Sequence, residues 1–131
     1  MTTITIESKQ RVELIDITDQ LRSSIRSSGI AEGLAVVYTP HTTAAVTINE
    51  NADPDVVRDL VATLNKLVPF DDNYRHSEGN SAAHVKSSLV GASETLIVAS
   101  GEPLLGTWQG VYFCEFDGPR RRQVHIKVIG A

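Results

Sequence analysis

The chain has 131 residues, of which 41% are hydrophobic and 21% charged, so it is long enough for one domain with a hydrophobic core and too short for two. Its 12 Lys and Arg residues against 16 Asp and Glu residues give a net charge of −4, which argues against a general nucleic-acid binder because such proteins carry a basic surface. The single cysteine, Cys114, excludes an internal disulfide bond and a zinc site built from several cysteines.

The sequence has no segment typical of a membrane protein or an exported protein. Its apolar runs are all shorter than the ~20 residues of a membrane-spanning helix, and residues 1–11 lack the apolar core of a signal peptide. No Gly/Ser-rich linker or internal repeat divides the chain. We therefore expect residues 1–131 to form one cytoplasmic domain that binds neither nucleic acid nor membrane.

Two strands and a short helix are predicted at the start of the chain. Residues 2–8 alternate Thr and Ile, and residues 11–18 form a second strand that we expect to pair with the first. Asp16 or Thr18 is expected to cap the helix, because their side-chain oxygens can accept hydrogen bonds from free backbone N–H groups. Gly29 follows the helix, a position that often holds glycine.

The middle of the chain contains further strands and the most regular helical pattern. Residues 33–39 are apolar and rich in β-branched side chains, and residues 44–48 continue this strand or form its antiparallel partner. Asp53 and Pro54 begin a helix, with Asp as the cap and Pro in the first turn. Apolar residues then recur at spacings of three and four, which predicts an amphipathic helix.

The second half predicts a polar loop, one more helix and a series of strands. The loop covers residues 69–79, and the helix runs from Asn80 or Ser81 to Gly91. The predicted strands span 95–99, 102–105, 107–116 and 120–129, and a hairpin turn at 117–118 is expected to join the last two. Strands at both ends with two or three helices between them indicate a mainly antiparallel α+β fold.

Three histidines lie near the ends of predicted segments. His41 stands between two strands beside Thr42 and Thr43, where imidazole can bind a metal and hydroxyls can bind phosphate, although the same residues suit an ordinary turn. His76 in the loop and His84 in the first turn of the following helix are eight residues apart and match no strict zinc motif. Carboxylates that could complete a metal site are Glu50, Asp53, Asp71, Asp72 and Glu78.

The segment 105–110 contains two glycines and the only tryptophan. Glycines beside a strand often allow a ligand or a crossing chain to approach the backbone. Trp108 could stack on a flat substrate, but packing in the core is the expectation for this residue taken alone. Cys114 lies in an apolar strand and is interpreted as a small buried hydrophobe rather than a nucleophile.

Arginines gather at the start of the last predicted strand. Arg120 and Arg122 share the core-facing side with Val124, whereas Arg121 shares the solvated side with His125. An arginine on the core side needs a partner, which is either a carboxylate such as Glu115 or Asp117, or a bound phosphate.

Four segments together resemble the YjbQ-like family, whose members are known as secondary thiamine-phosphate synthases. They are HTTAAVTINENADPDVVRDL (41–60), YRHSEGNSAAHVKSSLVGAS (74–93), LLGTWQGVYFCE (104–115) and DGPRRR (117–122). The resemblance covers essentially the whole chain, and the motifs occur in the order of the family. It implies a β-sandwich with helices, a homotrimer with sites near the subunit boundaries, and a weak ability to make thiamine phosphate.

The resemblance also implies which residues form the site. Its histidines fall on His41, His76 and His84 as catalytic residues and as ligands of a divalent metal, zinc or magnesium, and its acidic position falls on Glu50. Its substrate- and phosphate-binding positions fall on Thr42, Thr43, Gly106, Thr107, Trp108, Gln109, Arg120 and Arg122. Some relatives have an Asp where this chain has Ser81, Ala82 and Ala83, so a metal here would need another carboxylate or water.

The leading hypothesis is a small trimeric enzyme that joins hydroxymethylpyrimidine diphosphate to a thiazole phosphate. Such a reaction asks the protein mainly to hold two anionic substrates together and to neutralise the departing diphosphate. One alternative is metal-dependent hydrolysis of a phosphorylated metabolite by the same histidines. The other is a non-catalytic protein that binds a phosphorylated ligand.

Overall fold

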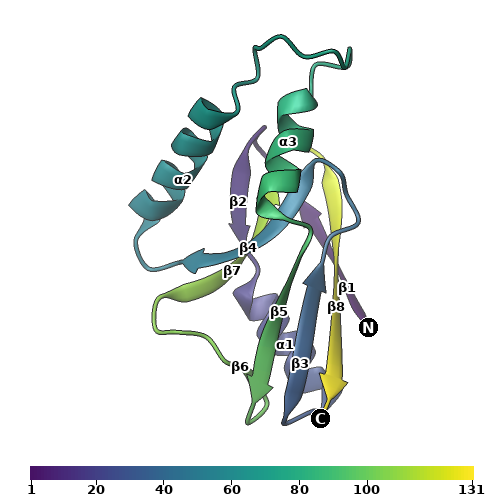
Figure 1. Ribbon diagram of the computed structural model, residues 1–131. Helices are drawn as coiled ribbons and strands as arrows, with labels where there is room; N and C mark the ends of the chain where they lie inside the picture. The colour runs from purple at the N-terminus through teal and green to yellow at the C-terminus, as the bar shows by residue number, and fades with distance from the viewer.

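The computed structural model describes residues 1–131, and eight strands and three helices follow one another along the chain (Figure 1). The strands are β1 (Thr2–Glu7), β2 (Glu13–Asp16), β3 (Gly33–Tyr38), β4 (Ala44–Glu50), β5 (Ser93–Ala99), β6 (Glu102–Pro103), β7 (Gln109–Glu115) and β8 (Arg121–Gly130). The helices are α1 (Thr18–Ser28), α2 (Pro54–Leu67) and α3 (Ser81–Val90). No helix has the length and apolar character needed to cross a membrane.

Two antiparallel sheets enclose the main hydrophobic core. The larger sheet has the order β1-β8-β3-β5-β6, and the smaller has the order β2-β7-β4. Inward side chains of both sheets and the buried face of α1 meet between them, with Val37 and Val124 from one sheet and Phe113 from the other fully buried. The structure confirms the predicted α+β fold with mainly antiparallel strands.

The predicted strand pairings are wrong in three places. Strands β1 and β2 do not pair with each other, because β1 pairs with β8 and β2 with β7. Strands β3 and β4 also lie in different sheets, and residues 117–118 carry the chain from one sheet to the other instead of closing a hairpin. The alternation of apolar residues indicates only which face of a strand is buried. Because both sheets bury their inner faces in the same core, this pattern does not show which sheet a strand joins.

Helix α1 begins one residue later than a cap at Asp16 would require. Ile17 occupies the capping position without a side-chain hydrogen bond, while Asp16 Oδ1 accepts hydrogen bonds from the Thr18 backbone N–H at 2.9 Å and its hydroxyl at 2.5 Å. Asp16 therefore still satisfies a free N–H of the first turn. Gly29 ends the helix with a φ of 70°, which is the left-handed conformation expected there.

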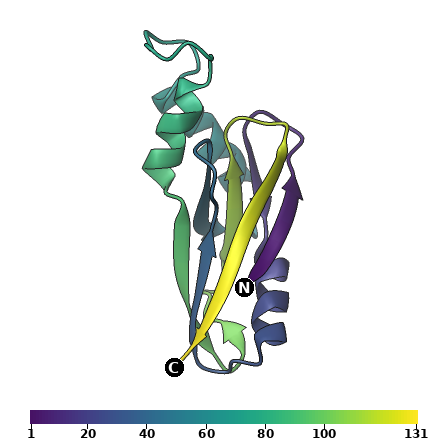
Figure 2. The ribbon, with the colours of Figure 1, turned by 90° about the vertical axis from the view of Figure 1, so that its right-hand side faces the viewer.

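Helices α2 and α3 lie on the outer side of the smaller sheet and are joined by the loop at the top of Figure 1. Asp53 caps α2 as predicted by accepting a hydrogen bond from the Asp55 N–H. Helix α2 nevertheless has no buried residue, although Val61 and Leu64 contact a second core that includes Phe116. Figure 2, turned by 90°, shows β8 and β1 along the side of the molecule away from these helices.

Candidate functional site

The structure brings His76 and His84 together at the joint between α2 and α3. His84 lies in the first turn of α3, and His76 lies in the loop that precedes this helix. Their ring centroids are 5.4 Å apart, and the ring planes are nearly perpendicular at 85°. This edge-to-face contact is one of the preferred arrangements of aromatic rings.

An open cavity of about 380 Å³ surrounds the two imidazoles. Its lining residues are Tyr74, Arg75, His76, Ser81, His84 and Val85. Arg75 is exposed and forms no ion pair, so its guanidinium group remains available to a ligand. The Tyr74 hydroxyl instead donates a 2.6 Å hydrogen bond to the Pro69 carbonyl and ties the loop to its own start. Arg75 and the two imidazoles therefore line one cavity.

One chain does not assemble the three-histidine metal site that the sequence predicts. No group of three or more His, Cys, Asp and Glu side chains lies close enough together to hold a metal ion. The nearest carboxylate to the pair belongs to Glu78, whose Oε1 is 3.9 Å from His76 Nε2. His76, His84 and Glu78 therefore do not form a preassembled metal site within one chain.

His41 lies in the turn between β3 and β4, and it does not join the other two histidines. Its Nε2 accepts a 2.9 Å hydrogen bond from the Gln123 backbone N–H, so the lone pair on that nitrogen is not free to bind a metal. Partial burial, followed by the positive charge of Arg122, lowers the pKa of His41 below 6.5. Both effects favour the neutral imidazole.

Arg122 has a carboxylate partner in the core, which is one of the two kinds of partner that the sequence left open. Its Nε donates to both oxygens of Glu115, and its Nη2 donates to Glu115 and to the Thr43 hydroxyl, the latter at 2.7 Å. Arg122 is 3% exposed and Glu115 fully buried. The side chains of Arg122 and Thr43 are thus committed to the fold at the positions predicted to bind phosphate.

Glu115 is held in its charged form by several donors. Burial raises its pKa, but the Arg122 guanidinium, the Ser8 hydroxyl at 2.6 Å and the Asp117 backbone N–H at 3.0 Å outweigh that effect. The net result is a pKa below 4.5. The buried pair is therefore a fully bonded structural element.

Arg120 and Thr42 remain near the surface beside this buried pair. Arg120 is exposed and bonds Asp117, through its Nε to the backbone carbonyl and through its Nη2 to the carboxylate. The side chain of Thr42 is exposed and forms no hydrogen bond to another residue. These two side chains, unlike Arg122 and Thr43, can still contact a ligand.

Trp108 is 62% exposed, so the expectation that it packs in the core is wrong. It lies on a tight loop in which the Gly106 N–H donates to Gln109 Oε1 at 2.8 Å and the Gln109 N–H donates to the Gly106 carbonyl at 3.1 Å. The Asn51 N–H binds the Trp108 carbonyl at 2.9 Å. This network presents the indole to solvent.

The same loop confirms the close approach predicted from its glycines. A Cβ atom at Gly110 would lie 2.4 Å from Asn51 Nδ2, so the approaching group is the side chain of a neighbouring segment. Glu50 pairs with Gln109 across β4 and β7, and its backbone carbonyl accepts a 3.0 Å hydrogen bond from the Tyr112 hydroxyl. Asn51 and Tyr112 thus support this loop and Glu50, and neither was predicted as a site residue although both lie in the segments that carry the family resemblance.

The predicted site residues fall into three places on one chain. The turn before β4 and the segment leading into β8 hold His41, Thr42, Thr43, Arg120 and Arg122. Glu50 and the loop with Gly106, Thr107, Trp108 and Gln109 lie at the opposite end of the β4–β7 pair, whose seven-residue strands run antiparallel over roughly 20 Å. His76 and His84 form the third place.

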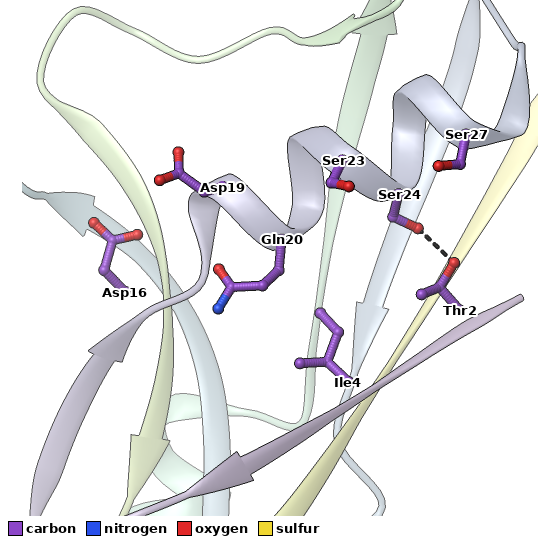
Figure 3. Close-up of a pocket in the computed structure, with 8 residues that line it drawn as sticks. All are labelled: Thr2, Ile4, Asp16, Asp19, Gln20, Ser23, Ser24 and Ser27. Carbon is purple, nitrogen blue, oxygen red and sulfur yellow. Dashed lines mark hydrogen bonds between the residues drawn. The ribbon is translucent and has the colours of Figure 1, made fainter.

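The largest of the five main hollows, of about 590 Å³, lies elsewhere, between β1 and α1 (Figure 3). Hydroxyls, one amide and two carboxylates line it, and Ile4 is its only hydrophobic residue. Ser24 donates to the Thr2 hydroxyl across this hollow at 2.8 Å. None of the predicted site residues lies here, so size alone does not identify the site.

Cys114 fits its interpretation as a buried hydrophobe. The thiol is 1% exposed, and burial raises its pKa to about 12, so little reactive thiolate forms near neutral pH.

Comparison with known proteins agrees with the fold and the motifs. The family model described as "UPF0047 protein YjbQ-like" matches residues 2–131. A UPF0047 protein of Methanocaldococcus jannaschii is 56% identical over 95% of this chain and 91% of its own length. The UPF0047 protein YugU of Bacillus subtilis is 52% identical over 98% of both chains.

A solved structure of a YjbQ/UPF0047 protein from Clostridium acetobutylicum superposes with a TM-score of 0.97 at 49% identity, covering 98% of this chain and all of that one. The fold is thus that of small α+β proteins with two curled antiparallel sheets and three helices. The chain belongs to the YjbQ/UPF0047 family.

Proposed function

We propose that this chain is a homotrimeric enzyme that binds a small phosphorylated metabolite at the His76–His84 cavity and has thiamine-phosphate synthase activity as a secondary reaction. The observation that carries the proposal is the pair of contacting imidazoles in a cavity that Arg75, an arginine in no ion pair, also lines. The order of the family motifs supports the synthase chemistry.

The start of α3 adds a second source of positive potential to this cavity. Ser81 begins the helix and lines the cavity, and Asn80 makes no capping hydrogen bond through its side chain. A helix N-terminus carries free N–H groups and a partial positive charge, which favour phosphate. Together with Arg75, this feature supports binding of a phosphate or diphosphate group.

The proposed reaction requires one substitution at carbon. The lone pair of the thiazole nitrogen attacks the pyrimidine methylene carbon, the carbon–oxygen bond breaks, and its electron pair leaves with the diphosphate. Arg75 and the helix N-terminus would stabilise the charge on that leaving group, and an imidazole of the pair would supply it with a proton. The protein contributes orientation and charge rather than a covalent intermediate.

The assembly into a homotrimer would add the residues that one chain holds elsewhere. Glu50, Trp108, Thr42 and Arg120 are all reachable from solvent, so a neighbouring copy could present some of them at the cavity. A divalent metal, zinc or magnesium, would draw His76, His84 and Glu78 closer together or take further ligands from the neighbouring copy or from water. Sedimentation equilibrium would test the trimer, and a monomer mass at micromolar concentration would contradict it.

The test of function is product formation from the two thiamine precursors by purified protein, with and without a chelator. His84→Ala is expected to lower turnover by about 10²–10⁴-fold, the usual contribution of a general acid or base. His125→Ala is the matched control, because this histidine lies on β8 and bonds Thr3 away from the cavity. Full synthase activity in His84→Ala would contradict the assignment.

The same experiment separates the two alternatives. Release of phosphate without thiamine phosphate, lost on chelation, would favour a metal-dependent hydrolase. Binding of diphosphate without any turnover would favour a non-catalytic binder. Elemental analysis of the purified protein tests the metal directly, and less than about a tenth of a metal ion per chain would contradict it.

A further inference from the structure

Lys86 is a buried cation without a carboxylate partner. It lies on α3 two residues after His84 and is fully buried, and its Nζ donates a 2.7 Å hydrogen bond to Asn65 Oδ1 on α2. The same Nζ is 3.8 Å from the centroid of the Phe70 ring. The lysine therefore connects both helices to the first residues of the loop between them.

A second cation contacts the same aromatic ring. The guanidinium carbon of Arg11, from the segment between β1 and β2, is 3.5 Å from the centroid of Phe70. Arg11 Nη2 also points to the Gly79 carbonyl at 3.5 Å, close to the other end of the loop. We name Arg11, Asn65, Phe70 and Lys86 the cation clamp, because two cations hold one ring at the base of residues 69–80.

The clamp matters for His76 because this histidine has no hydrogen bond of its own that fixes it. Its contacts are the edge-to-face packing with His84 and the 3.9 Å approach of Glu78. The position of His76 thus depends on how firmly the ends of the loop are held. Phe70 is the loop side chain that reaches the core beside α2 and α3.

The charge of Lys86 is unfavourable for stability at this buried position, so its role is more than packing. A buried ammonium group costs several kcal/mol of desolvation, and an apolar side chain of similar length would avoid that loss. A cation over an aromatic ring, in contrast, is attracted to one orientation of that ring, and this attraction grows when water is excluded. The arrangement therefore favours orientation of Phe70 over stability.

We propose that Lys86 is a positioning residue that fixes Phe70 and thereby holds His76 against His84 in a binding-competent arrangement. The effect on ligand binding rests on the proposed function of the cavity. The effect on the contact between the two imidazoles does not, since it concerns the geometry of this chain alone.

Nuclear magnetic resonance of the histidine ring protons tests the geometry. In the unaltered protein, the edge-to-face contact of His76 and His84 is expected to shift the ring-proton resonances of the pair. Lys86→Met is expected to move the His76 resonances toward those of a free histidine. Lys66→Met, an exposed lysine on α2, is the matched control and is expected to leave them unchanged.

Pyrophosphate binding tests the consequence for the cavity. Lys86→Met is expected to weaken binding on the order of tenfold, because the loop must then be ordered by the ligand. A purely structural role predicts a lower melting temperature with unchanged His76 resonances and unchanged affinity, and this result would overturn the proposal. Arg11→Gln and Phe70→Leu provide the same test if Lys86→Met fails to fold, and unchanged His76 resonances in both would overturn it.

The two proposals fail in different ways. If the unaltered protein binds no pyrophosphate, the proposed function is wrong, and the His76 resonances alone then decide whether the clamp positions the loop. If pyrophosphate binds equally well to Lys86→Met and to the unaltered protein, the clamp does not hold a binding-competent arrangement and the proposed function stands.

Discussion

The two buried cations of this protein have opposite surroundings. Arg122 bonds the carboxylate of Glu115 and the hydroxyl of Thr43, so its charge is neutralised within the core between the sheets. Lys86 has one amide and one aromatic ring as partners and no carboxylate. The ion pair of Arg122 therefore helps to hold the two sheets together. Lys86 has no such partner, so the desolvation cost of its charge is not offset by a counter-ion, and this cost falls between α2 and α3, beside the candidate site. The variants that follow test this contrast.

Removing the charge of Glu115 is expected to have the largest effect. Glu115→Gln leaves the guanidinium of Arg122 buried without its counter-ion, which should lower the free energy of unfolding by about 3–5 kcal/mol. Urea denaturation at pH 7 measures this loss. A loss below about 1 kcal/mol would mean that the pair does not secure the core.

Lys86 should produce an increase in stability at alkaline pH. Burial, together with the nearby charge of Arg11, lowers its pKa from 10.5 to about 8. The unfolded chain therefore binds more protons than the folded one between these values, so stability rises as the pH increases from about 8 to 10.5.

The full rise corresponds to about 3 kcal/mol, taken from the difference in pKa. Urea denaturation of the unaltered protein and of Lys86→Met across this range measures it. Lys86→Met should lack this rise in the free energy of unfolding, and Lys66→Met should keep it. Equal pH profiles in all three proteins would show that the buried charge of Lys86 carries no such cost.

His41 should weaken the fold on mild acidification. Its pKa is lowered from 6.5 in the folded chain, so the unfolded chain takes up a proton first as the pH falls, and stability is lost from about pH 6.5 downward. Denaturation of His41→Gln between pH 7 and 5 should show less of this loss. An unchanged profile would assign the acid sensitivity to another group.

The smallest effect is expected for an ion pair on the surface, which contrasts with the buried pair of Arg122 and Glu115. Glu7 and Arg121 form an ion pair at 2.8 Å across β1 and β8, with both side chains largely exposed. Glu7→Gln should change the free energy of unfolding by about 0–1 kcal/mol, because water and salt screen such pairs. A change as large as that of Glu115→Gln would show that burial does not set the difference.

The sequence predicted the elements better than their arrangement. Alternation and capping are local properties, so the strand at 33–39 and the Asp53 start of α2 could be recognised from neighbouring residues. Pairing depends on which sheet each strand enters, and two strands that bury their inner faces in one core have the same pattern in either sheet. The hairpin expected at 117–118 failed for this reason.

The site shows the same division. The alternation of side chains along the last strand placed Arg122 on the buried side, where its charge requires a partner. The choice between Glu115 and a phosphate depended on a contact between two strands, which alternation does not specify. Trp108 was expected inside because tryptophan usually packs there, whereas the bonds of its own loop hold it outside. Lys86 gave no signal at all, since a lysine on a short helix ordinarily indicates a solvated face.

The crossing of the chain between sheets also bears on how the protein folds. Apart from the short β5–β6 hairpin, every paired strand has a partner from a distant part of the sequence, and β1 pairs with β8. Non-local pairing of this kind slows folding toward milliseconds to seconds, because long loops must close before the contacts form. During synthesis, the first strand has no partner until the last has left the ribosome, so β1 spends that interval as an unpaired edge open to chaperones or to other chains.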